Sequence, residues 1–409
     1  MSIFRKINKK IILIYLLLSA YIFYVFYRTN PLNLNSNCGF DGSLYCKIAL
    51  GELVFEPYSR RTFIPKLISL FPITNESVYQ YFYFFNLFVI IGTISFLFWF
   101  FLKLKNSNFI YLLILLIFNP NFLRMLESMP VMLDFFALLL VLIYFSIYYT
   151  NNQKKFLIIL ISIVTVLAFT RENLPILITF SIFTHSIVFH FKNFKSTLFN
   201  LIILIYTIFI TFISFKQSSI DAPNYVPDTE IKNVLIFWLQ DIIRSPDDFF
   251  RFIYLLFIGL GFIGIMSLIS WKQIIGVNGY IYLFSFLSVI SGVLLGGDTA
   301  RIMFIPFVTL TLIYLTNKKM NTRTLLLICL TIISWNPMQF SDGSEFSFLQ
   351  MYGQRYLDFA VYKQQMQQIV FNSIFFIILF LVGNAIYDYL RTKNGKFSQG
   401  GSDILSRSD

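Results

Sequence analysis

The stretch NCGFDGSLYCKIALGE, residues 37 to 52, contains the first acidic residue of the chain. Asp41 follows Phe40 and precedes Gly42, so one side of its carboxylate is unshielded, because glycine has no side chain. A carboxylate placed in this way can take the proton of an attacking hydroxyl group. Tyr45 follows as a supporting polar side chain. Asp41 is therefore a candidate for acid–base chemistry.

Two further segments place opposite charges close to prolines. TRENLP contains Arg171 and Glu172, and NPNFLRMLESMPVMLD contains Glu127 and Asp134. Short apolar segments interrupted by such polar residues indicate helices that end inside a protein, since exposed backbone groups must line a cavity. Each tip on its own is also typical of a solvated turn.

The segment GGDTARIMFIPF, residues 296 to 307, starts with a glycine pair that allows a tight turn. Asp298 can cap the following helix, and Arg301 falls in its first turn. A cation at a helix N-terminus opposes the helix dipole, so Arg301 needs an anionic partner. The alternative is an arginine that extends to lipid headgroups.

A basic pair, Arg60 and Arg61, precedes apolar residues at helical spacing, among them Phe63, Leu67 and Phe71. This pattern predicts an amphipathic helix at a membrane surface, with its cations directed at phosphate groups. Arginine suits phosphate because its planar fork matches the phosphate oxygens. We therefore expect Arg60 and Arg61 to bind phosphate groups. Supporting polar residues are Tyr45, Glu127, Asp134, Glu172 and Asp298.

The elements that position these residues follow from composition. The chain has 409 residues, of which 57% are hydrophobic and 13% are charged, and its mean hydropathy is +0.72. A soluble domain of this size needs more polar surface. We expect an all-α polytopic membrane protein, in which the net charge of +12 reports topology and implies no nucleic-acid partner.

A bilayer core needs about 20 apolar residues per helix, and fewer where a helix is buried in protein. About twelve transmembrane helices are predicted on this basis, centred in 11–27, 79–102, 109–118, 131–149, 156–169, 174–190, 197–215, 249–270, 277–295, 302–315, 324–336 and 368–387. They form a single polytopic domain over 1–392, followed by a flexible cytoplasmic tail over 393–409. RSPDDFFRF predicts a helix that starts at Pro246, with Ser245 as its cap.

Charge fixes the expected orientation. With a cytoplasmic N-terminus, KLK at 103–105 and the lysine pair at 154–155 lie in cytoplasmic loops. All acidic residues before Asp388 fall on the opposite side. Both termini are therefore expected in the cytoplasm, and the large outward loops cover 28–78, 216–248 and 337–367. Cys38 and Cys46 can form a bridge if the first of these loops faces an oxidising compartment, or can remain unpaired.

Four motifs carry a resemblance to a known family. FDGSLYCKIA, MPVMLDFFALLL, TREN and GGDTARIMFIPF resemble, in order and in membrane side, the pattern of the GT-C superfamily of polytopic glycosyltransferases over roughly residues 1 to 320. The resemblance implies a sugar donor linked to polyprenyl phosphate. It also implies that Asp41 is the catalytic acidic residue of the first loop and acts as the general base. It implies that Arg301 lies near the lipid phosphate, where Arg171, Arg60 and Arg61 are expected to bind as well.

The expected protein is thus a transferase of the bacterial inner membrane with its site facing the periplasm. Its partners are a lipid-linked sugar, membrane lipids and a glycan, lipid or protein acceptor. No cofactor is expected, and the first loop has no Asp-x-Asp pair for a metal, although a divalent metal stays open. Two alternatives remain: an O-antigen-like polysaccharide polymerase or ligase, and a flippase or transporter of lipid-linked sugars.

Overall fold

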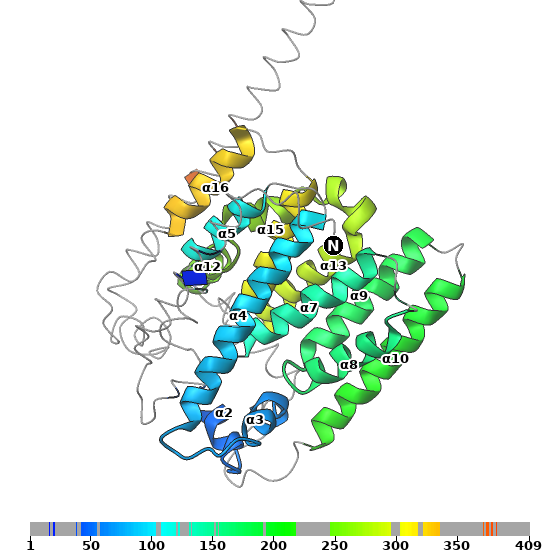
Figure 1. Ribbon diagram of the computed structural model, residues 1–409. Helices are drawn as coiled ribbons and strands as arrows, with labels where there is room; N and C mark the ends of the chain where they lie inside the picture. The colour runs from blue at the N-terminus through cyan, green and yellow to red at the C-terminus, as the bar shows by residue number, and fades with distance from the viewer. Residues whose placement is uncertain are drawn as a thin grey trace, which may run out of the picture.

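The computed structural model describes residues 42–54, 58–103, 108–119, 133–150, 155–190, 194–217, 246–295, 303–317 and 322–335, with some isolated residues such as Cys38, Phe122 and Val131. Across these residues the chain forms twelve α-helices and no β-strand (Figure 1). The expectation of an all-α fold is therefore confirmed for the described part of the chain.

Ten of these helices follow the predicted apolar spans. They are α4 (Val78–Lys103), α5 (Phe109–Phe118), α7 (Asp134–Tyr149), α8 (Leu157–Ala168), α9 (Asn173–His190), α10 (Phe194–Gln217), α12 (Pro246–Ile269), α13 (Trp271–Leu295), α15 (Phe304–Asn317) and α16 (Thr322–Trp335). The predicted first and last spans, 11–27 and 368–387, fall almost entirely outside the described residues. Helix α12 begins at Pro246, which confirms the helix start predicted from RSPDDFFRF.

Two of the described helices are long and apolar enough to cross a membrane, α4 over Val78–Phe101 and α10 over Phe194–Lys216. Several other apolar helices, among them α5, α7 and α8, are shorter. Two such helices alone indicate membrane association only weakly, because the core helix of a soluble protein passes the same test.

The helix ends are sorted into two groups at opposite ends of the bundle. At one end the start of α5 meets the end of α15, where Asn108 Nδ2 donates to the carbonyl oxygen of Leu315 over 2.8 Å. At the other end the turn after α8 contacts α10, where Ser214 Oγ donates to Ala168 O over 3.0 Å. These contacts pair the start of α5 with the end of α15, and the end of α8 with the last turn of α10.

The second end carries a small substructure that we call the cap, defined as the described residues from Cys38 to Phe71. It contains α2 (Gly42–Ala49), the 3₁₀ helix η2 (Tyr58–Arg60) and α3 (Phe63–Ile68). Figure 1 shows α2 and α3 beside the first turns of α4. The cap has its own buried hydrophobic cluster, separate from the main core, which includes Tyr45, Ile64, Ile68, Phe82, Val131 and Leu133.

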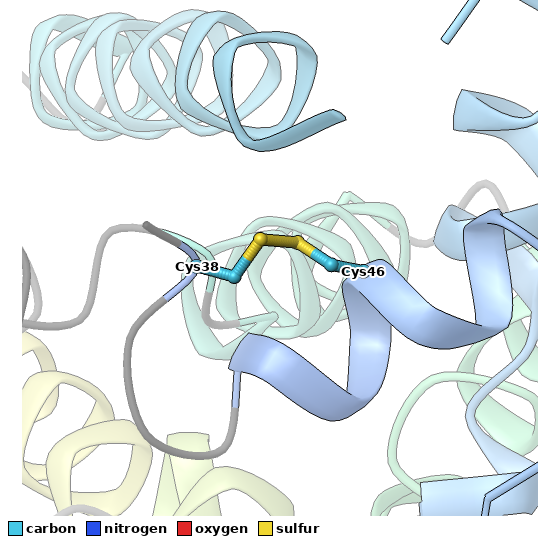
Figure 2. The surroundings of a disulfide bond; sticks show 2 residues. All are labelled: Cys38 and Cys46. Atoms are coloured by element: carbon cyan, nitrogen blue, oxygen red, sulfur yellow. A yellow bond between two sulfur atoms is a disulfide. The ribbon is translucent and has the colours of Figure 1, made fainter. Parts of the chain in front are cut away.

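The two cysteines of the cap form a disulfide bond (Figure 2). Cys38 and Cys46 are both buried. The bond joins Cys38, which precedes α2, to Cys46 within α2. Of the two arrangements that the sequence left open, the structure therefore shows the bridged one.

The predicted amphipathic helix of the first loop is present in shorter form. Helix α3 has six residues, and Pro65 lies in its first turn, where a proline is tolerated. Ile64 and Ile68 point into the cap, whereas Leu67 and Phe71 are exposed. An exposed apolar side is therefore a real feature of this segment.

Helix α12 is broken once. Gly261 adopts φ 58° and ψ 177°, a conformation open essentially only to glycine. The backbone N–H of Ile263 after the break donates to Thr331 Oγ1 of α16 over 3.1 Å. A side chain of another helix thus satisfies an amide at the interruption.

Candidate functional site

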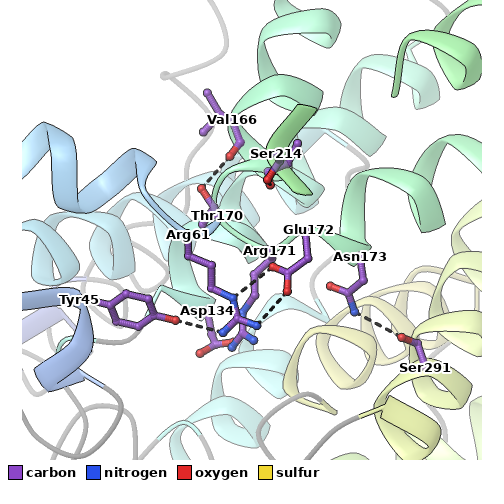
Figure 3. Close-up of polar contacts among 11 residues, drawn as sticks. Tyr45, Arg61, Asp134, Val166, Thr170, Arg171, Glu172, Asn173, Ser214 and Ser291 are labelled. Atoms are coloured by element: carbon purple, nitrogen blue, oxygen red, sulfur yellow. Dashed lines mark hydrogen bonds and ion pairs between the residues drawn. The ribbon is translucent and has the colours of Figure 1, made fainter. Parts of the chain in front are cut away.

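Four charged side chains meet where the cap rests on the helix ends. We call Arg61, Asp134, Arg171 and Glu172 the charge cluster; Figure 3 shows them together with Tyr45. They come from the cap, the start of α7 and the turn between α8 and α9. Arg61, Asp134 and Arg171 are buried, and the side chain of Glu172 is only 15% exposed. Buried charges are rare unless they are paired, and these are paired.

The turn between α8 and α9 separates its two charged residues. Thr170 Oγ1 donates to Val166 O over 2.7 Å, and the N–H of Arg171 donates to Leu167 O over 2.7 Å, which closes the end of α8. Helix α9 starts only two residues later, at Asn173. Arg171 is thereby directed to α7 and Glu172 to the cap, although the two are adjacent in the chain.

Arg61 joins the cap to this turn. Its Nε lies 3.2 Å from Glu172 Oε2 and its Nη2 lies 3.3 Å from Glu172 Oε1, so the pair is bidentate. Its Nη1 donates to the hydroxyl oxygen of Tyr45 on α2 over 3.2 Å. Every nitrogen of the guanidinium group therefore has a protein acceptor.

The environment keeps both members of this pair charged. Burial alone lowers the pKa of Arg61, but the charge of Glu172 and the hydrogen bonds to Glu172 and Tyr45 outweigh it, so this pKa lies well above its ordinary value. Burial alone raises the pKa of Glu172, but the charge and hydrogen bonds of Arg61 outweigh it and lower this pKa. The pair is thus an ion pair at neutral pH.

The second pair joins the same turn to α7. Arg171 Nη2 donates to Oδ1 of Asp134, which is the first residue of α7. An acidic residue at this position also complements the helix dipole. Arg171 Nε is buried and makes no hydrogen bond to any part of the chain that the structure describes. Arg171 therefore keeps a donor that the described protein groups do not use.

A hydrogen bond and an aromatic contact bring further helix ends to the cluster. Asn173 Nδ2 donates to Ser291 Oγ over 3.3 Å, which places the last turns of α13 beside α9. The ring of Phe304, at the start of α15, lies 5.5 Å from the ring of Phe135, the neighbour of Asp134. The segment that joins α13 to α15 contains Arg301, but residues 296–302 lie outside the described residues.

The predicted site residues divide into two groups. The structure brings together Tyr45, Arg61, Asp134, Arg171 and Glu172, and it places Arg60 with its Cζ 3.9 Å from the centre of the Phe215 ring of α10. Asp41, Glu127, Asp298 and Arg301 lie outside the described residues. The roles assigned to these residues stay predictions.

Sequence reasoning did not anticipate which charges pair. Arg61 and Glu172 are 111 residues apart, and no local pattern connects them. Asn173 and Ser291 were missed because an asparagine after a charged pair and a serine in an apolar helix are common. Among the described residues, no group of three or more His, Cys, Asp or Glu side chains could hold a metal ion.

Fold and site thus define an all-helical chain with a disulfide-bonded cap and two buried ion pairs beneath it. Comparisons with protein-family models, with curated proteins and with solved structures give no match.

Proposed function

We propose that the protein is an integral membrane glycosyltransferase that moves a sugar from a polyprenyl-phosphate-type lipid to an acceptor at the periplasmic face. The observation that carries the proposal is the spare donor of Arg171 beneath the cap whose first helix starts directly after Asp41. A buried arginine with an unused N–H can bind an anionic oxygen. In the sequence Asp41 directly precedes α2. Helix α2 is linked through Tyr45 and Arg61 to Glu172, the neighbour of Arg171.

Insertion in a membrane is supported by the outer surface of α10. Ile202, Ile205, Phe209 and Phe212 are between 57% and 60% exposed along one side of this helix. An apolar surface of this length is unusual on a soluble monomer and suits the acyl chains of lipids. Helix α4 adds Phe84 and Phe88, which are 61% and 72% exposed.

The disulfide supports the periplasmic side. Bonds of this kind form and persist in oxidising compartments, and the bacterial periplasm is one of them. The cap and the charge cluster then face the periplasm, whereas the basic loops at 103–105 and 154–155 face the cytoplasm. We accordingly place the protein in the bacterial inner membrane with both termini in the cytoplasm.

In the proposed reaction Asp41 takes the proton of the acceptor hydroxyl as its oxygen bonds to the anomeric carbon of the sugar. The bond between that carbon and the lipid phosphate breaks, and the phosphate leaves with the electron pair. Arg171 and Arg301 stabilise the charge that develops on the phosphate, in a site with few competing waters. Arg60 lies at the edge of the cap, where a lipid headgroup can approach.

A second candidate is favoured by one observation, the break in α12 at Gly261. Interrupted helices of this kind form the substrate sites of many secondary transporters. The alternative function is therefore movement of a lipid-linked sugar across the membrane without transfer.

The deciding experiment uses purified protein in liposomes with a radiolabelled sugar on polyprenyl phosphate, or the same sugar on a nucleotide. We expect sugar transfer from the lipid donor only, and a loss of about 10²- to 10⁴-fold in Asp41→Asn. Glu52→Gln, in the same loop, serves as the control and should be mild.

Transfer from the nucleotide donor, or full activity in Asp41→Asn, would contradict the proposal. Movement of the labelled lipid between leaflets without a glycosylated product would favour the transporter.

A further inference from the structure

We infer that Arg61 is a positioning residue that clamps helix α2 to the turn between α8 and α9, and that it does not bind the donor phosphate. The catalytic consequence of this inference rests on the proposed function, whereas the clamp itself does not. The sequence alone assigned Arg61 to the phosphate, so the inference gives this residue a different role.

The first argument is the use of its donors. The bidentate contacts to Glu172, at 3.2 and 3.3 Å, and the 3.2 Å contact to Tyr45 engage Nε, Nη2 and Nη1. These contacts use three of the five N–H donors of the guanidinium group, one on each nitrogen. A phosphate that took the two donors on Glu172 would displace it and leave a largely buried carboxylate without its cation. Arg171, by contrast, keeps Nε for a ligand.

The second argument is the position of its partners. Tyr45 is fully buried in the cap cluster, and its ring lies 5.7 Å from that of Tyr58 in an edge-on arrangement. Arg61 Cζ lies 5.4 Å from the centre of the Tyr58 ring. Arg61 thus holds α2 through Tyr45, and Tyr45 also packs on Tyr58 of η2, which directly precedes Arg61 in the chain.

The third argument is what α2 carries. The helix starts at Gly42, directly after Asp41, and the disulfide joins its Cys46 to Cys38. Two attachments, one covalent and one ionic, therefore bracket the segment that contains the proposed base. Small displacements of a catalytic group from its productive geometry can cost about 10²-fold in rate.

The turn to which Arg61 is tied also anchors the neighbouring backbone. The N–H of Phe63 donates to Phe169 O over 3.2 Å, and the ring of Phe63 stacks on Phe136 of α7 at 6.2 Å. Loss of the ion pair therefore leaves α3 attached and releases chiefly α2. The effect of a variant at Arg61 is accordingly expected to be local.

The test compares Arg61→Met, Arg61→Lys and Glu172→Gln with Lys66→Met, which removes an exposed cation from the same loop. The kinetic readout is kcat against KM for the polyprenyl-phosphate-linked sugar. The first three variants should lower kcat about 10- to 100-fold and leave KM within about twofold. Lys66→Met should match the wild type.

Arg61→Lys separates the two roles. Lysine binds phosphate as a point charge, so a phosphate ligand tolerates this change, but lysine cannot hold Glu172 in a bidentate pair and Tyr45 at once. A raised KM with unchanged kcat in Arg61→Met, or a fully active Arg61→Lys, would overturn the inference.

A second readout needs no activity. The disulfide of the folded protein is buried, with Cys38 2% and Cys46 4% exposed, so it should resist a water-soluble phosphine. We expect its reduction, followed by thiol alkylation and mass spectrometry, to be at least about tenfold faster in Arg61→Met and in the milder Glu172→Gln.

An unchanged reduction rate in both variants would refute the clamp. If the wild type transfers no sugar, the proposed function fails, and the reduction rates alone decide whether Arg61 holds α2.

Discussion

Helix α2 begins in contact with Val131, and only a residue without a side chain fits there: a Cβ atom at Gly42 would lie 2.8 Å from the Cβ of Val131. Real Cβ atoms do not approach so closely, and the contact atom belongs to the stiff part of a β-branched side chain. The start of α2 and the residues before α7 are therefore fitted to each other. Asp134 of the charge cluster follows Val131 by only three residues, so this fit joins the cap to the segment that leads into the cluster.

Gly42→Ala should push α2 away from Val131. Overpacking of this kind costs about 1–3 kcal/mol, and we expect a lower midpoint of thermal unfolding in detergent. Gly92→Ala in α4 is the matched control, because its nearest neighbour, Leu139 Cδ2, would lie 3.8 Å away. A Gly42→Ala protein as stable as Gly92→Ala would show that α2 adapts freely.

Asp134→Leu should destabilise the protein strongly. It leaves the buried Arg171 without its carboxylate, and such losses cost about 3–5 kcal/mol. The double variant Asp134→Leu with Arg171→Met removes both charges and should recover most of the stability. Thermal unfolding of the two single variants and the double variant gives the coupling energy, and additive losses would contradict a buried pair.

The ion pair of Arg61 with Glu172 should respond to acid and not to base. The pKa of Glu172 is lowered in the folded state, so the pair contributes fully above the ordinary glutamate value of about 4.3, and the contribution is lost as the pH falls through the folded-state pKa. The raised pKa of Arg61 keeps its charge at alkaline pH. The stability difference between wild type and Glu172→Gln should be constant between about pH 6 and 8 and shrink below about pH 4. A difference that vanishes near neutral pH would be inconsistent with these shifts.

The break in α12 should depend on Thr331. Thr331→Val removes the acceptor of the Ile263 amide, and an unsatisfied buried donor costs about 1–3 kcal/mol. Thr316→Val is a suitable control, since its hydroxyl donates to Ile313 O within its own helix. Equal unfolding midpoints for the two valine variants would mean that the amide has found another partner.

The disulfide gives a direct test of the side that the cap faces. The chain has three cysteines, and Cys329 is exposed and free. We expect one thiol to react with a maleimide in denaturant and all three to react after reduction. Three reactive thiols without reduction, in protein made with its export machinery intact, would argue for a cytoplasmic cap.

Helix positions were predictable because a long apolar segment has few possible structures other than a helix. The predicted 109–118 agrees with α5, and 174–190 differs from α9 by one residue. Helix α3 was expected to extend to Phe71 but ends at Ile68. The helix ends where Ser69 Oγ donates to Lys66 O over 2.8 Å. The spacing of apolar residues does not predict this hydrogen bond.

The charge cluster was predictable only in part. The TRENLP tip was interpreted as helices that end inside the protein, with a solvated turn as the alternative, and Arg171 and Glu172 are buried or largely buried. Arg60 and Arg61 were treated alike, yet Arg60 covers the ring of Phe215 and Arg61 binds Glu172. The two side chains have different partners because the backbone changes direction after η2. That direction depends on tertiary packing, so the sequence of two adjacent arginines does not reveal it.

The separate hydrophobic cluster of the cap implies an order of assembly during synthesis. The disulfide joins residues only eight positions apart, so it can close as soon as the segment reaches an oxidising compartment. The cluster itself needs Phe82, Val131 and Leu133, which are made later. The ion pair of Arg61 needs a still later residue, since Glu172 follows it by 111 residues. The cap segment is thus made well before the residues that complete its contacts, and until Glu172 is made Arg61 cannot form this ion pair.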